Sequence, residues 1–80
     1  MDDGVVGPGT IVTIVYEGDD DDMAETYLLG HIEERRGDLD VISPGSPLGA
    51  ALLGHCPGDT VRYEAPNGTL GVKILQVSAA

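Results

Sequence analysis

Three side chains in this sequence could bind a metal ion or act as a nucleophile: His31, His55 and Cys56. A closed zinc site needs four ligands at recognisable spacing, and one cysteine with two histidines provides fewer than that. A Cys–His nucleophile pair requires side chains that face each other, which immediate neighbours such as His55 and Cys56 rarely do. The sequence therefore predicts no catalytic residue, no metal site and no cofactor, and it favours loop or edge packing for these three residues.

Four consecutive aspartates, Asp19 to Asp22, form the densest local charge in the chain. Calcium-binding loops place their carboxylates at alternate positions, with a glycine at the sharp turn, and four adjacent aspartates do not match that spacing. Adjacent carboxylates also repel one another and extend into water. We therefore expect this run to form the solvated tip of a hairpin.

A short helix is predicted in the middle of the chain. Ser46 is a favoured N-cap, because its hydroxyl can accept a hydrogen bond from an amide of the first helical turn. Pro47 suits the first helical position, where its missing N–H costs nothing. Gly54 can adopt the left-handed conformation that ends a helix.

This helix of about two turns is too short to be stable alone, so it must dock on another element. Leu48, Ala51 and Leu52 share one face that can pack on a sheet. We expect Gly49 and Ala50 to permit close approach of the helix backbone to that sheet.

The rest of the chain predicts strands and turns, in the overall order β-β-β-α-β-β. The strands are expected over residues 11–16, 25–32, 39–42, 61–65 and 70–77. The first is apolar on both faces, so we place it in the centre of the sheet. Turns are expected at the charged segment 33–38, at Pro57-Gly58-Asp59 and at Pro66-Asn67-Gly68, where Asn-Gly is the usual hairpin pair. The predicted core includes Leu48, Leu52, Val61, Tyr63 and Ile74.

Length, charge and cysteine content restrict the class of protein. The 80 residues form one domain at most, and the net charge is −10. That charge argues against unaided binding to nucleic acid or to an anionic membrane, and favours a basic patch on a protein partner. A single cysteine permits no intrachain disulfide and fits a reducing compartment, and no segment has the apolar length of a membrane span. We expect a cytoplasmic monomer.

One segment carries a family resemblance. Residues 41–54, with the sequence VISPGSPLGAALLG, resemble the helix region of the C-terminal domain of bacterial Gre-type transcript cleavage factors. Residues 57–61 and 65–68 fit the turns on either side of that domain's next strand. Residues 8–14 and 25–29 are similar to its first two strands, so the resemblance covers most of the chain.

The resemblance implies an α+β domain of FKBP-like fold, in which a twisted antiparallel sheet wraps one short helix. We expect this domain over residues 10–78, after a flexible lead-in over residues 1–9. Gre-type factors also have an N-terminal coiled coil, whose acidic tip helps to hold the Mg²⁺ that cleaves backtracked RNA. That coiled coil is absent from this chain.

The resemblance also implies a partner, which is bacterial RNA polymerase. In Gre-type factors the globular domain docks at the rim of the secondary channel, through positions that match Gly45, Ser46 and Pro47. This surface implies no direct contact with nucleic acid. Physical reasoning leaves a second interpretation open for Ser46 and Pro47, in which they only cap the helix.

Two alternative functions remain at this point. An FKBP-like fold raises prolyl isomerase activity, which requires a dry aromatic pocket, and the chain contains three tyrosines but no phenylalanine or tryptophan. The other alternative is a stand-alone regulator that occupies the channel rim and blocks other factors. The first is an enzyme and the second, like the main prediction, is not.

Overall fold

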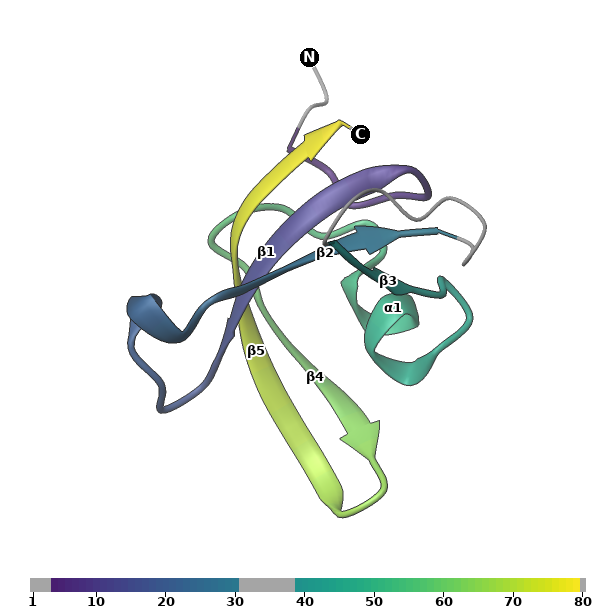
Figure 1. Ribbon diagram of the computed structural model, residues 1–80. Helices are drawn as coiled ribbons and strands as arrows, with labels where there is room; N and C mark the ends of the chain where they lie inside the picture. Colours follow the sequence, from purple (N-terminus) through teal and green to yellow (C-terminus); the bar gives the residue numbers. More distant parts are fainter. Residues whose placement is uncertain (1–3, 31–38, 80) are drawn as a thin grey trace.

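The computed structural model describes residues 4–30 and 39–79, which form one five-stranded sheet and one short α-helix (Figure 1). The elements are β1 (Thr10–Tyr16), a single 3-10 turn η1 (Asp21–Met23), β2 (Glu25–Leu29), β3 (Asp40–Ile42), α1 (Pro47–Leu52), β4 (Thr60–Ala65) and β5 (Gly68–Ala79). The order of the strands in the sheet is β3-β2-β1-β5-β4. The predicted α+β class and element order are confirmed.

β1 lies in the centre of the sheet, as its sequence predicts. Val12 and Ile14 are fully buried in the main core, and Val15 is only 4% exposed. Because successive side chains of a strand point to opposite faces, burial of both Ile14 and Val15 means that both faces of β1 are covered. The β-branched side chains of this segment suit such a position.

The sheet is mixed, so the expectation of a purely antiparallel sheet is wrong at one pair of strands. β2 and β3 run parallel, with Leu28 opposite Val41 and Leu29 opposite Ile42. Parallel neighbours cannot be joined by a tight hairpin and need a longer crossover. Ten positions, 30–39, separate the two strands, and of these residues 31–38, which include His31 and the charged segment 33–38, lie outside the described part of the chain.

α1 has the predicted boundaries. Ser46 is the N-cap, and its Oγ accepts a hydrogen bond from the Gly49 N–H at 3.1 Å. Pro47 is the first helical residue, and Gly54 follows the helix with φ of +82°. Leu52 is fully buried in the core.

Gly49 brings the helix into contact with the backbone of its own lead-in turn. A Cβ at this position would lie well inside van der Waals contact with the carbonyl oxygen of Ser43. Gly49 therefore permits a close backbone approach, but to the turn before the helix and not to the sheet, where it is expected. Ala50 does not, because it lies on the exposed side of the helix.

The main core joins the sheet, the helix and part of the N-terminal segment. Its buried members are Val6, Val12, Ile14, Leu29, Leu52, Val61, Val72, Ile74 and Val77. Leu48 and Tyr63, predicted as core, are partly buried against this cluster. Within the described part of the chain, no helix is long and apolar enough to cross a membrane.

Residues 1–9 are expected to form a loose lead-in, but Val6 within this segment is packed. Its side chain is 2% exposed, its N–H donates to the His55 carbonyl at 2.9 Å, and its carbonyl accepts from the Gly54 N–H at 2.9 Å. The packed part of the domain therefore includes Val6 and does not begin at Thr10. The two hydrogen bonds tie this segment to the loop that follows α1.

The β4–β5 hairpin turns one position earlier than its Asn-Gly pair suggests. Ala65 pairs with Gly68, so Pro66 and Asn67 form the two-residue connection. Gly68 is already the first residue of β5, with φ of +131°. Proline at the first turn position fixes a negative φ, which a type I′ turn does not accept there.

Two glycine substitutions test whether α1 is held by backbone contact. Gly49→Ala should lower the free energy of unfolding by about 1–3 kcal/mol, because the new methyl group meets a backbone carbonyl that cannot move freely. Gly71→Ala is the matched control: the three atoms nearest to its methyl group all belong to the side chain of Glu17, which is 46% exposed and can rotate away. Its cost should stay within about 0.5 kcal/mol. Urea denaturation measures both, and equal costs would contradict the proposed packing.

Candidate functional site

The turn between β3 and α1 contains all three residues predicted to bind a partner. This pre-helix turn, defined as Ser43–Pro47, exposes Gly45 and Pro47 and half-buries Ser46. The Ser43 carbonyl accepts hydrogen bonds from the Ser46 N–H at 3.0 Å and from the Ser46 hydroxyl at 2.7 Å. The Ser43 Oγ accepts from the Gly45 N–H at 3.1 Å. The structure therefore gathers Gly45, Ser46 and Pro47 on one exposed turn with internal hydrogen bonds.

Gly45 is not required by the conformation of this turn. Its φ lies outside the left-handed region, and a Cβ there would meet only the Ser43 Oγ, at an ordinary contact distance of 3.7 Å. The position can therefore carry a larger side chain without backbone strain. This makes it a clean place to test the surface by substitution.

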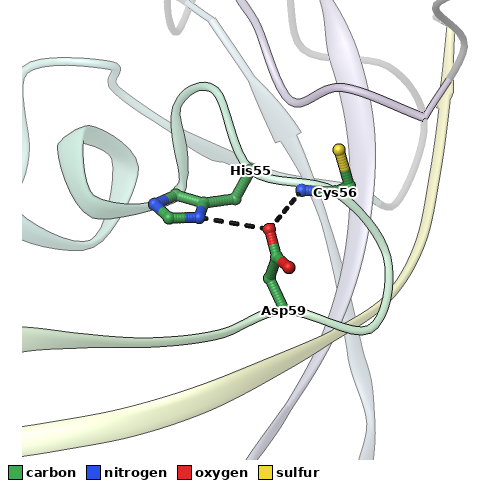
Figure 2. Close-up of polar contacts among 3 residues, drawn as sticks. All are labelled: His55, Cys56 and Asp59. Carbon is green, nitrogen blue, oxygen red and sulfur yellow. Dashed lines mark hydrogen bonds and ion pairs between the residues drawn. The ribbon is translucent and has the colours of Figure 1, made fainter.

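The loop that follows α1 brings His55, Cys56 and Asp59 together (Figure 2). The Asp59 Oδ2 accepts a hydrogen bond from the Cys56 N–H at 2.9 Å and lies 3.2 Å from the His55 Nδ1. The Asp59 N–H in turn donates to the Cys56 carbonyl at 3.0 Å. The amide of Cys56 and, to a smaller extent, the His55 ring hold the pKa of Asp59 below its ordinary value.

This cluster closes a turn and offers no nucleophile pair. Figure 2 shows the Cys56 sulfur directed away from the His55 ring. Pro57 and Gly58 form the middle of the turn, and Gly58 has φ of +95°, as the Pro-Gly-Asp sequence predicts. Among residues 4–30 and 39–79, no group of three or more His, Cys, Asp or Glu side chains is placed to hold a metal ion. His31 lies outside the described residues.

The acidic run lies at the solvated tip of the β1–β2 hairpin, as predicted. Asp19 to Asp22 are all exposed. The Asp19 N–H donates to the Tyr16 carbonyl at 3.0 Å, and the Met23 N–H to the Asp20 carbonyl at 2.8 Å. The first bond closes the turn that follows β1 and the second belongs to the 3-10 turn η1, and the four carboxylates stay in water.

The tyrosines form hydroxyl contacts that sequence reasoning did not find. The hydroxyls of Tyr16 and Tyr63 lie 3.1 Å apart, and Tyr27 donates to Glu25. The hydrogen bond to Tyr63, together with partial burial, raises the pKa of Tyr16 to about 12. Burial, together with the bond to Glu25, also raises the pKa of Tyr27. Nothing in the spacing of these residues indicates the Tyr16–Tyr63 pair, because it joins strands that are not neighbours in the sheet.

The fold places this chain in a class of small α+β domains found in solved transcription factors. A GreA/GreB transcription elongation factor from Nitrosomonas europaea matches with a TM-score of 0.73 and 26% identity, over 98% of this chain and 63% of that one. Gfh1 from Thermus aquaticus matches with a TM-score of 0.74 and 24% identity, over 98% of this chain and 50% of that one. At that lower identity the second match shows the fold alone.

Sequence relatives define the family more narrowly. GreA from Streptomyces coelicolor is 49% identical over 75 residues, which are 92% of this chain and 45% of that protein. GreA from Saccharopolyspora erythraea is 52% identical over 75 residues, 91% of this chain and 45% of that protein. The family described as "Transcription elongation factor, GreA/GreB, C-term" matches residues 1–79. The chain therefore belongs to the GreA/GreB C-terminal domain family, and it spans about 45% of the length of these curated relatives.

The Asp59 hydrogen bonds predict a loss of stability in acid. Because the pKa of Asp59 is lowered in the folded state, its contribution is fully present above its ordinary value of 3.8 and is lost as pH falls through the lower folded value. Asp59→Asn should therefore reduce the urea midpoint at pH 7, and this deficit should shrink on acidification below about pH 4. Asp22→Asn, which removes the same charge from the exposed hairpin tip, should show no such deficit. A deficit for Asp59→Asn that is constant with pH would contradict the assignment.

Proposed function

We propose that this chain binds bacterial RNA polymerase at the rim of the secondary channel, and that the pre-helix turn makes the contact. The proposal is carried by one observation: in a chain that belongs to the GreA/GreB C-terminal domain family, Gly45, Ser46 and Pro47 lie together on an exposed turn. The sequence relatives of this chain are named as transcription elongation factors. The proposal places the chain in the bacterial cytoplasm, where the polymerase acts.

The turn is well suited to binding because its shape is fixed before contact. Three of its internal hydrogen bonds involve Ser43, and a fourth links the Ser46 Oγ to the Gly49 N–H of the helix. Behind the turn, Leu52 anchors α1 in the core. A surface that is already ordered loses less conformational entropy on binding, so a small area can still give useful affinity.

Charge supports a basic partner surface. The net charge of −10 would speed the encounter with such a surface and make binding sensitive to salt. A single exposed turn buries little area, so we expect affinity on the order of micromolar. In this account the chain supplies docking and no chemistry.

The two alternative functions, a stand-alone regulator and a prolyl isomerase, differ in how far the structure supports them. A stand-alone regulator would use the same turn at the same channel rim, so it shares the docking proposal. Prolyl isomerase activity gains no support from the described residues, in which Tyr16 and Tyr63 direct their hydroxyls at each other. No separate observation favours it.

A charge placed at the turn tests the docking surface. Gly45→Lys should weaken competition with a full-length Gre factor for RNA polymerase by about tenfold or more, which corresponds to 1.4 kcal/mol. The added lysine occupies the contact and faces a basic surface. Gly45 tolerates the side chain without strain, so the fold should be retained.

Met23→Lys provides the matched control for the same gain of charge. Met23 is 61% exposed in η1, which Figure 1 shows well away from α1. This variant should compete like the unmodified chain, with circular dichroism confirming that both variants are folded. If Gly45→Lys competes as well as Met23→Lys does, the docking surface lies elsewhere.

A further inference from the structure

β4 forms one edge of the sheet and has a free side. Within residues 4–30 and 39–79, β4 pairs with β5 alone. The ladder between β1 and β5 ends at Tyr16 and Val72, and among the described residues 68–70 of β5 pair only with β4. Figure 1 shows this end of the hairpin projecting away from α1 and from the other strands. A two-stranded extension of this kind is only marginally stable by itself.

The backbone groups that face outward from β4 can be assigned. The Gly71 carbonyl accepts a hydrogen bond from the Glu17 N–H at 2.9 Å, on the side of β1. Gly71 therefore faces away from β4, and its partner across the hairpin, Arg62, belongs to a pair without mutual hydrogen bonds. In such a pair both residues turn their N–H and C=O outward. By the two-residue period of a strand, Thr60 and Glu64 also present theirs to the free edge.

If two copies of β4 pair along their free edges, their opposite charges face each other in one antiparallel register only. Arg62 and Glu64 are exposed and share one face, and Tyr63 between them points to the other face. If a second β4 pairs antiparallel about Tyr63, each Arg62 lies opposite Glu64 of the other copy. A shift of the register by two residues places Arg62 opposite Arg62, or Glu64 opposite Glu64. Opposite charges across a strand pair are favourable and like charges are not.

We propose that β4 pairs antiparallel with β4 of a second copy of this chain, about a two-fold axis at Tyr63. Each Arg62–Glu64 pair then exchanges both of its backbone hydrogen bonds and joins opposite charges. On the other face of the joined sheet, four side chains then lie side by side in one row. From one copy to the other, their order is Leu70, Tyr63, Tyr63, Leu70. Leu70 is 42% exposed and pairs with Tyr63 in the hairpin, so this row covers apolar surface that the single chain leaves open.

The existing contacts of the two charges do not prevent this pairing. Arg62 lies 3.4 Å from Glu17, and Thr69 donates to Glu64 at 3.2 Å, both in exposed positions. Repulsion between two chains of net charge −10 opposes association. At about 0.15 M salt the Debye length is ~8 Å, so this long-range repulsion is largely screened while pairs in contact keep their attraction. A strand pair buries far less than the ~1,200 Å² of a stable interface, so the dimer should be weak.

Charge exchange on the full chain tests the inference. Sedimentation equilibrium up to about 1 mM chain at 0.15 M salt should show a growing dimer fraction, as expected for an interface this small. Arg62→Glu and Glu64→Arg, each alone, place like charges in both pairs and should weaken dimerisation at least tenfold. The double variant Arg62→Glu with Glu64→Arg restores opposite charges and should recover it.

Matched controls separate the local pairing from net charge. Lys73→Glu changes the net charge as Arg62→Glu does, and Asp20→Arg changes it as Glu64→Arg does, and neither lies on the free edge. Both should dimerise like the unmodified chain once folding is verified. In NMR spectra the Arg62 and Glu64 amides should shift with concentration more than those of Val61 and Tyr63. A chain that stays monomeric throughout, or a double variant that fails to recover, overturns the inference.

Discussion

The close contact between Gly49 and the backbone of Ser43 is the constraint on which the rest of the candidate site depends. A Cβ at residue 49 would clash with the Ser43 carbonyl oxygen, which also accepts two hydrogen bonds from Ser46. One peptide group thus fixes the turn to the helix. A helix of six residues has no stability of its own. Its position must come from contacts with the rest of the chain, which at its start are this contact and the burial of Leu52.

The other end of α1 is fixed by a second set of backbone bonds. The Gly54 N–H and the His55 carbonyl both bond to Val6, and Asp59 closes the turn that leads into β4. The helix is therefore tied to the N-terminal segment after its last turn and to β3 before its first. Such anchoring keeps a short, exposed turn in one shape, which suits the docking proposed for it.

Local features of this fold could be predicted from the sequence, and features set by distant contacts could not. The caps Ser46 and Gly54 act on residues within one helical turn, so their types alone indicate the boundaries of α1. The parallel pairing of β2 with β3 depends on a crossover, and residue types within the strands do not determine its direction. Val6 bonds to His55 and Gly54 and packs in the core with residues distant in the sequence, so no local pattern indicates its burial.

The candidate site also has local features that the sequence predicts and distant contacts that it does not. Gly45, Ser46 and Pro47 are adjacent in the sequence, so their grouping on one turn follows from the helix start. Their proposed role in docking came from the family resemblance and not from their chemistry. The Tyr16–Tyr63 hydroxyl pair joins residues 47 positions apart and had no signal in the sequence.

The most direct test of the central claim is an amide hydrogen-exchange footprint of the chain bound to RNA polymerase. If the pre-helix turn docks at the channel rim, the amides of Gly45, Ser46 and Leu48 should show the largest gain in protection. Those of the exposed hairpin tip, Asp19 to Asp22, should exchange as in the free chain. Protection that is greatest at the hairpin tip, with none at the pre-helix turn, would contradict this account.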